Sequence, residues 1–177
     1  MKALTTKLDG VYLIENFVFE DYRGTFVKAF THNETTLKNL NFQVQEIYFS
    51  VSHKGVLRGM HFQRPPMDHA KFIYLVSGTI TDVLLDLRKS SATYQQHAAF
   101  DISKEQALYI PAGIAHGFVA HEEQTVVVYN QSSPYSKEHD EGVLWNSFGY
   151  DWGVVNPTIS VRDRAHPPLS EYESPFE

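Results

Sequence analysis

Short hydrophobic segments recur along the chain, and where they alternate with polar residues the pattern is typical of a strand with one buried face. The clearest case is the segment 46–52, where Ile47, Phe49 and Val51 share one parity. Segments 72–76 and 79–87 are also strand-like, and Ser77-Gly78 between them predicts a hairpin. Further strands are predicted over 93–102, 108–110, 117–120 and 125–130. Their spacing predicts an all-β sandwich or barrel.

Helical signals are few. Residues 35–40 are predicted to form one or two turns, and Ser103 is predicted to cap another short helix over 103–106. After Trp152 the chain is rich in proline and has few periodic apolar residues. We expect this tail, about residues 153–177, to lie extended over the domain. The alternative is a disordered terminus, because prolines and charges bury little surface.

Length, charge and cysteine content narrow the classes of protein. The 177 residues predict one domain over 1–177, and the absence of cysteine excludes disulfides, thiolate metal sites and a cysteine nucleophile. A net charge of −6 disfavours nucleic acid and anionic membranes as partners. The chain has neither an apolar run of about 20 residues nor an N-terminal signal-peptide pattern. We therefore expect a soluble cytoplasmic protein.

The densest cluster of reactive residues is the segment Arg58-Gly59-Met60-His61-Phe62-Gln63. On a regular strand, His61 and Gly59 share one face and Arg58 lies on the other. We expect His61 to point into a barrel interior, beside a glycine that leaves room for a ligand. A neutral imidazole can accept a proton near pH 7. The alternative is a hydrogen-bonded core histidine.

A second cluster has the spacing Pro111-x-Gly113-x-x-His116, which resembles the second signature of the cupin β-barrel superfamily. Metal-dependent cupins supply further ligands from a His-x-His pair in the first signature. Here Gln63 stands at the second position of that pair, and a divalent metal normally needs three or more ligands. Lys71 near the same place would repel a cation. We expect no catalytic metal, and taken alone His116 is as readily a structural residue.

Several motifs occur in a characteristic order along nearly the whole chain. They are DYRGTF at 21–26, GVLRGMHFQ at 55–63, Lys71, DVLLDLR at 82–88, IPAGIAHGF at 110–118, Tyr129, Tyr135 and SVRD at 160–163. Together they resemble the dTDP-4-dehydrorhamnose 3,5-epimerases and related nucleotide-sugar epimerases. The resemblance implies a cupin-like double-stranded β-helix, or jelly-roll barrel, and a homodimer that exchanges its N-terminal strands, about residues 1–50. It also implies an isomerase of deoxysugar and surface polysaccharide biosynthesis that needs no cofactor.

The family reaction inverts carbon 3, carbon 5 or both in a nucleotide-linked 4-keto-6-deoxyhexose. Such an inversion needs a base on one face, an acid on the other, and a group that stabilises the enolate oxygen. By analogy with the family, His61 is the base, Asp163 orients its ring, Tyr129 is the acid and Lys71 faces the enolate. Without the resemblance, these last three would be read as a turn-forming aspartate, a barrel-wall tyrosine and a solvated lysine.

The resemblance also implies a set of substrate-binding residues. Arg58 would bind the diphosphate, His116 the sugar, and Tyr135 the base, while Arg23 and Phe26 would reach in from a neighbouring subunit. Gln63, at the end of the segment 58–63, is also expected to bind the substrate.

The chain departs from the family pattern mainly at residues expected to hold the nucleotide. Lys28 stands where the best-known members have Glu, Glu46 and Tyr48 stand where they have Gln and Asn, and Arg162 stands where they have Lys. Asp140 and Glu141 are both candidates for a further carboxylate. Because these changes alter charge, the nucleotide stays open among thymidine, cytidine and guanosine diphosphates.

Three other functions fit the same motifs. A 3,4-ketoisomerase would use a similar pocket but return the proton to another carbon. A metal-dependent cupin oxygenase would carry a stoichiometric transition metal. A sugar-binding cupin without catalysis would bind the nucleotide sugar and exchange no proton with solvent.

Overall fold

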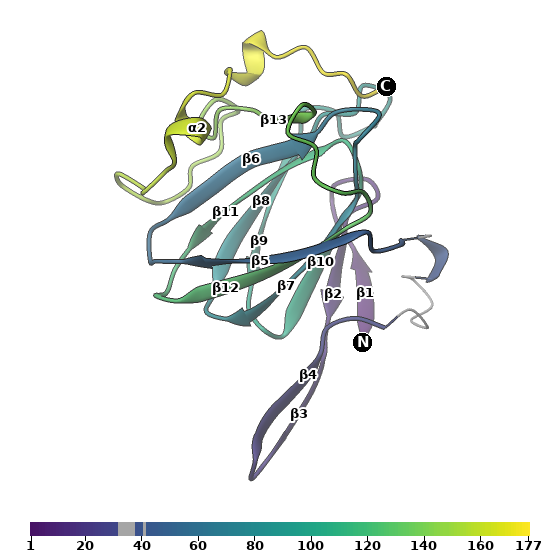
Figure 1. Ribbon diagram of the computed structural model, residues 1–177, viewed down its shortest axis with the longest axis vertical. Helices are drawn as coiled ribbons and strands as arrows, with labels where there is room; N and C mark the ends of the chain where they lie inside the picture. Colours follow the sequence, from purple (N-terminus) through teal and green to yellow (C-terminus); the bar gives the residue numbers. More distant parts are fainter. Residues whose placement is uncertain (32–37, 41) are drawn as a thin grey trace.

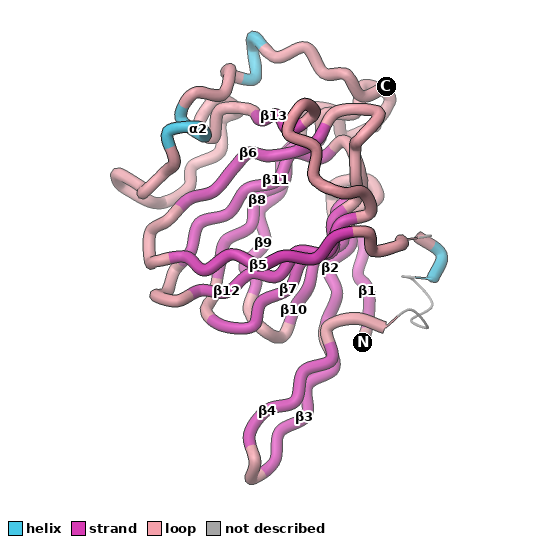
Figure 2. Tube along the Cα trace, viewed as in Figure 1, coloured by secondary structure: helices cyan, strands magenta, loops and turns pink. Residues whose placement is uncertain are grey.

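The computed structural model describes residues 1–31, 38–40 and 42–177, and almost all of its regular structure is antiparallel strand (Figures 1 and 2). The strands are β1 (Lys2–Thr5), β2 (Tyr12–Glu15), β3 (Phe17–Asp21), β4 (Gly24–Lys28), β5 (Glu46–Ser52), β6 (Leu57–Gln63), β7 (Lys71–Ser77), β8 (Ile80–Asp86), β9 (His97–Ile102), β10 (Gln106–Ile110), β11 (Ile114–Ala120), β12 (Thr125–Gln131) and β13 (Asp140–Gly142). Two short helical elements, α2 (Val161–Arg164) and η1 (Leu169–Glu171), lie in the C-terminal tail.

Two sheets face each other and form the predicted cupin-like barrel. One has the strand order β1-β2-β10-β7-β12-β5, and the other has the order β13-β6-β11-β8-β9. The all-β prediction is therefore confirmed. No helix in the described part of the chain is long and apolar enough to cross a membrane.

Apolar side chains fill the space between the sheets and also cover both outer faces. Ile73, Leu84 and Phe118 belong to the core between the sheets. Phe42 packs on the outer face of the six-stranded sheet, and Trp152 belongs to the cluster outside the five-stranded one. Strands β8 and β11 are consequently buried on both faces, which explains why their apolar runs do not alternate.

The C-terminal tail lies over the five-stranded sheet, as predicted, and is ordered by burial of its own aromatic residues. Phe176 is 5% exposed and belongs to the same apolar cluster as Leu57 and Leu85. The helical turn α2 interrupts the extended path because the Ser160 hydroxyl accepts a hydrogen bond from the Asp163 backbone N–H at 3.0 Å. This cap fixes the position of Asp163.

Two predicted elements differ from the structure, and a third lies partly outside the described residues. The strand predicted over 93–102 begins at His97, because Ser91 and Thr93 donate hydrogen bonds to the Asp86 carboxylate and hold the preceding residues in a turn. Segment 103–106 is a tight turn between β9 and β10 and not a helix, with Ser103 Oγ bonded to Gln106 Oε1. Half of the helix predicted over 35–40, residues 35–37, lies outside the described residues.

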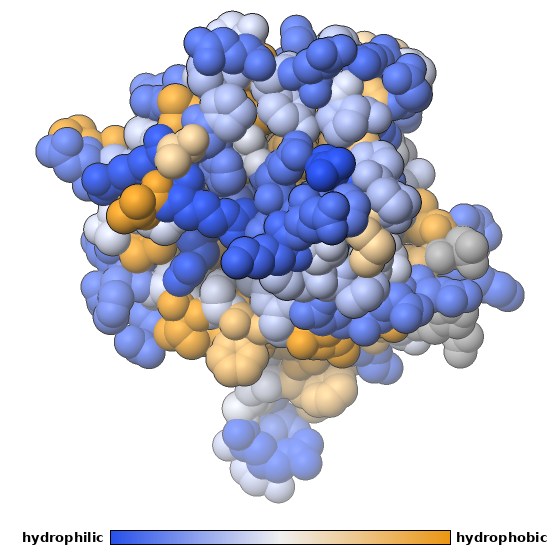
Figure 3. Space-filling view, turned by 45° about the horizontal axis from the view of Figure 1, so that its top comes forward, coloured by the Kyte–Doolittle hydropathy of each residue, from blue (hydrophilic) through white to orange (hydrophobic). Residues whose placement is uncertain are grey.

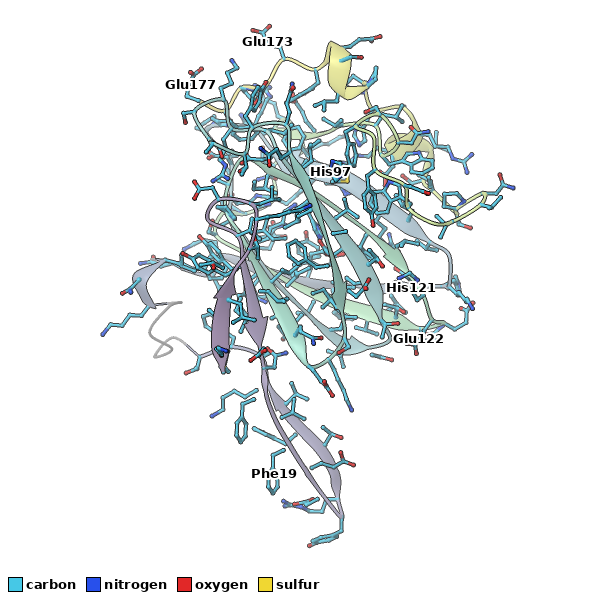
Figure 4. All side chains as sticks on the ribbon, turned by 180° about the vertical axis from the view of Figure 1, so that it is seen from behind. Phe19, His97, His121, Glu122, Glu173 and Glu177 are labelled. Atoms are coloured by element: carbon cyan, nitrogen blue, oxygen red, sulfur yellow. The ribbon has the colours of Figure 1, made fainter. Side chains whose placement is uncertain are left out.

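The β3–β4 hairpin, named here the arm, extends away from the barrel at the bottom of Figure 1. Within the part of the chain that the structure describes, its strands pair only with each other, and Figure 4 shows Phe19 far from the body of the molecule. Phe19 and Phe26 are 51% and 56% exposed. Strand β5 forms an open edge of the six-stranded sheet and exposes Ile47 and Phe49. Figure 3 shows hydrophobic side chains gathered where the arm meets the barrel.

Candidate active site

Two adjoining cavities, of about 190 and 290 Å³, share Tyr48, His61 and Lys71 in their walls. The smaller, named here the inner cavity, is lined by Tyr48, Ser50, Arg58, His61, Lys71, His116, Phe118 and Tyr129. The larger, named here the outer cavity, is lined by Glu46, Tyr48, His61, Phe62, Gln63, His69, Lys71, Gln131, Tyr135, Asp140 and Arg162. Most of the residues predicted for the site therefore come together in one place.

A β-bulge in β6 places Arg58 and His61 in the same cavity. His116 of β11 lies opposite His61, and Phe118 lies opposite Arg58, so two steps on β11 match three on β6. The prediction from simple alternation, which put Arg58 and His61 on opposite faces, was wrong because of this extra residue. Gly59 is required in the bulge: its φ is +132°, and an added Cβ would lie 2.5 Å from the Cα atom of Gly117.

His61 and Asp163 form a hydrogen-bonded dyad. His61 Nε2 lies 2.8 Å from Asp163 Oδ1, and Asp163 Oδ2 accepts a bond from the Gly59 N–H at 3.1 Å. Burial would raise the pKa of Asp163, but the hydrogen bonds from His61 and Gly59 hold it at about 2. Asp163 is therefore a carboxylate that can only accept, so His61 Nε2 carries the hydrogen. The free lone pair of His61 is then on Nδ1.

Tyr129 reaches the inner cavity from the opposite sheet. It lies on β12, and its hydroxyl is hydrogen-bonded to Ser50 Oγ at 3.2 Å. The ring of Tyr48 stacks on it with a centroid distance of 4.7 Å. Burial raises the pKa of Tyr129 well above its usual range. The phenol therefore stays protonated and can donate a proton.

Lys71 and His116 complete the polar wall of the inner cavity. The Lys71 ammonium donates to the His61 carbonyl at 3.0 Å, and burial lowers its pKa to about 8. The His116 ring is held by the buried Asp82 carboxylate, with Nε2 and Oδ2 2.7 Å apart. Burial lowers the pKa of His116 and raises that of Asp82. Lys71 is thus a cation at neutral pH, but it loses its proton at a lower pH than an ordinary lysine does.

Strand register builds the floor of the outer cavity, and one loop builds its mouth. Gln131 pairs in register with both Lys71 and Glu46. Glu46 accepts a bond from the Tyr135 backbone N–H, and Asp140 accepts one from the Tyr135 hydroxyl at 3.1 Å. The Tyr135 ring, which is 55% exposed, is therefore held at the mouth of the cavity.

Gln63 lines the outer cavity, but its amide is bonded to the protein. Its Nε2 donates to the Met67 carbonyl at 2.7 Å and to His69 Nδ1 at 3.1 Å, and its Oε1 accepts from the Ser136 N–H. These bonds tie β6 to the loop that carries Tyr135. The geometry favours a positioning role for Gln63 over direct substrate contact.

Five of the predicted site residues do not line the two cavities. Asp163 lies behind His61, as its predicted role requires. Arg23, Phe26 and Lys28 are on the exposed arm, where Arg23 pairs with Asp21 at 2.6 Å. Glu141 instead binds Arg64 at 3.0 Å and accepts a bond from Tyr172. Of the two candidate carboxylates, only Asp140 faces the outer cavity.

Sequence reasoning missed several residues at the site. Ser50 and Gln131 have the same parity as Tyr48 and Tyr129 on their strands, so alternation within β5 and β12 was a usable signal. His166, three residues after Asp163, had no such signal because its position depends on the path of the tail. Its Nε2 lies 4.0 Å from Asp163 Oδ1. Among the described residues, His61, Asp163 and His166 are the one group of three arranged so that it could hold a metal ion.

Comparison with known proteins identifies the family. The family model for dTDP-4-dehydrorhamnose 3,5-epimerase matches residues 5–171. The chain is 37% identical to the enzyme of that name from Methanothermobacter thermautotrophicus, over 96% of this chain and 95% of that one. A crystal structure of the Bacillus anthracis enzyme with TDP and PPi bound has a TM-score of 0.88 at 35% identity and covers 95% of this chain and 99% of that one. A Legionella pneumophila structure in complex with dTDP-4-keto-L-rhamnose has a TM-score of 0.92 at 26% identity and covers 99% and 98%. The chain belongs to the dTDP-4-dehydrorhamnose 3,5-epimerase family.

Proposed function

We propose that this protein epimerises a nucleotide-linked 4-keto-6-deoxyhexose at carbon 3, carbon 5 or both. The observation that carries the proposal is that His61, hydrogen-bonded to Asp163, and Tyr129 lie on opposite sheets around one cavity. A base and an acid on opposite sides of a substrate are what inversion of a carbon centre needs.

The proton moves in two steps. His61 Nδ1 removes the proton from the carbon beside the ketone, and negative charge develops on the carbonyl oxygen. The Lys71 cation stabilises that enolate, and Asp163 stabilises the imidazolium. The Tyr129 phenol then donates its proton to the opposite face of the same carbon. Solvent exchange restores Tyr129 and removes the proton from His61.

The outer cavity and the arginines suit the nucleotide part of the substrate. Arg58 lines the inner cavity and Arg162 the outer one, and guanidinium groups are well matched to phosphate oxygens. The Tyr135 ring at the mouth offers a face for a nucleobase. The nucleotide-bound relatives favour a dTDP sugar, whereas the acidic Glu46 in this cavity keeps CDP and GDP sugars as alternatives.

The function is tested by supplying dTDP-, CDP- and GDP-linked 4-keto-6-deoxyglucose separately in deuterium oxide. We expect one nucleotide to support fast incorporation of deuterium at carbon 3, carbon 5 or both, with epimerised product. Product with the ketone at carbon 3 would instead indicate a 3,4-ketoisomerase. Binding of all three sugars without exchange would indicate a sugar-binding protein and would contradict the proposal.

The charge of Lys71 predicts a pH dependence. Lys71 is protonated below its pKa of about 8 and loses its charge above it. Because the cation stabilises the enolate, kcat/KM should fall as the pH rises through about 8. Lys71→Met should lower kcat/KM about 10²- to 10³-fold at pH 7, the cost of losing one group that stabilises an oxyanion. Lys71→Met should also remove the decrease in kcat/KM above about pH 8. If the variant keeps that decrease, a group other than Lys71 causes it.

We propose that the protein is a homodimer in which the arm of each subunit packs on the other. The arm and the β5 edge both expose apolar side chains, including Phe19, Phe26, Ile47 and Phe49. An open sheet edge with exposed hydrophobic residues is usually covered by another chain. The arm would then carry Arg23 and Phe26 to the neighbouring active site.

A charge placed on β5 tests this assembly. Phe49 is 67% exposed, and Phe49→Asp should convert a dimer into a monomer in light-scattering measurements, because it would bury an unpaired carboxylate. Val155→Asp is the matched control, because Val155 is 91% exposed and lies outside both the arm and β5. A wild-type protein that is monomeric at micromolar concentration would contradict the proposal.

A further inference from the structure

His166 has an unused nitrogen atom beside the dyad. Its ring lies edge-to-face with His61, at a centroid distance of 5.8 Å, and its side chain is 11% exposed. Nε2 is buried and has no hydrogen-bond partner among the described residues. Gly142 leaves room for the ring, because a Cβ there would lie 2.5 Å from His166 Nε2. A buried polar atom without a partner calls for an explanation.

The three side chains have the composition and spacing of a transition-metal site. One ligand atom from each of His61, Asp163 and His166 lies within 4.8 Å of the others. Tetrahedral zinc, with bonds of about 2.0–2.2 Å, holds its ligand atoms roughly 3.4 Å apart. The two observed separations, 2.8 Å from His61 Nε2 and 4.0 Å from His166 Nε2 to Asp163 Oδ1, bracket that value. Small side-chain rotations would therefore close the site.

We propose that His61, Asp163 and His166 form a binding site for a divalent transition metal, best matched by zinc, and that the bound metal switches off proton abstraction by His61. Two imidazoles favour zinc, copper or nickel over magnesium or calcium. Three protein ligands leave a fourth position for water. The site uses the tail in place of the second barrel histidine, so it differs from the metal site of the metal-dependent cupins.

Zinc would inhibit the reaction by changing which nitrogen of the His61 ring carries the hydrogen. In the metal-free dyad this hydrogen is on His61 Nε2, and the lone pair of Nδ1 accepts the substrate proton. A metal on Nε2 takes the place of that hydrogen, which moves to Nδ1 of the neutral ring. His61 then has no free lone pair facing the substrate, and Asp163 is occupied by the metal. His166 takes no part in the proton transfer itself, so the zinc inhibition of each His166 variant is compared with that variant's own zinc-free activity.

The test begins with zinc binding, which needs no substrate. Metal-free full-length protein is titrated with zinc against a chromophoric chelator. We expect one zinc per chain in the wild type and loss of this site in His166→Ala and His166→Phe, whose folding is checked by thermal melting. His53→Ala is the matched control, because its exposed histidine lies outside the cluster. Equal zinc binding by wild type and both His166 variants would overturn the proposal.

The second readout is activity, and this part rests on the proposed function. Zinc should inhibit wild-type epimerisation, a chelator should restore it, and magnesium should have no such effect. Removing a residue that only hydrogen-bonds to a metal ligand typically lowers metal affinity about 10- to 100-fold. Removing the ligand His166 itself should therefore raise the zinc concentration that gives half-inhibition at least roughly tenfold. Complexation of zinc by the diphosphate is the same for every variant. If zinc binding depends on His166 but the protein has no epimerase activity, the proposed function is refuted and the zinc site stands. If zinc inhibits the wild type and the His166 variants equally, the proposed inhibition through this site is refuted.

Discussion

Replacing His61 with alanine should abolish deuterium incorporation from heavy water into the substrate while the protein still binds the nucleotide sugar. General-base catalysis contributes about 10²- to 10⁴-fold, so the exchange rate should fall by at least that factor. Binding should survive because Arg58, Tyr135 and Arg162 keep their positions in the cavity walls. Exchange is measured by proton NMR and binding by calorimetry.

The control for this variant is His121→Ala. His121 lies just beyond the end of β11 (Figure 4), and its ring bonds to Thr81. It lines neither cavity. Its replacement should leave exchange at the wild-type rate. Full exchange by His61→Ala would refute the assignment of His61 as the base.

Tyr129→Phe should separate exchange from inversion. The variant retains the His61–Asp163 dyad, so the proton beside the ketone is still removed and His61 can return deuterium to the same face. Inverted product should fall by about 10²- to 10⁴-fold, the usual contribution of a general acid. The expected NMR result is deuterated substrate with its original configuration.

Tyr109→Phe is the matched control, since Tyr109 is a buried tyrosine in the apolar cluster outside the six-stranded sheet. It should leave the ratio of exchange to inversion unchanged. Inversion by Tyr129→Phe at the wild-type rate would move the role of acid to another group, such as the neighbouring Ser50 hydroxyl.

Much of the fold could be predicted because alternation and turn residues are local signals. Strand β5 follows from its alternating pattern, and β7, β8 and β12 follow from short apolar runs rich in strand-forming residues. The turn at 103–106 was mistaken for a helix because a Ser-x-x-Gln pattern suits both a helix cap and a tight turn, with Ser103 bonded to Gln106. The bulge at Gly59 could not be predicted, because it depends on the close approach of Gly117 in β11.

The candidate site was accessible from the sequence only in part. The residues of the dyad are 102 positions apart, so periodicity alone could not pair His61 with Asp163, and the family resemblance did. The choice of Asp140 over Glu141 required the structure, since adjacent residues on β13 face opposite ways. The placement of His166 depends on the tail's path over the five-stranded sheet, which has no local pattern.

The most direct test follows the hydrogen at the carbon that inverts. Wild-type protein is incubated in deuterium oxide with dTDP-linked 4-keto-6-deoxyglucose, or with the CDP- or GDP-linked sugar if that is the better substrate. The product is examined by proton NMR. If His61 and Tyr129 act from opposite sides, each inverted carbon beside the ketone carries deuterium from the solvent. Inverted product that keeps its original hydrogen at that carbon would show that the two side chains do not exchange the proton and would contradict the mechanism.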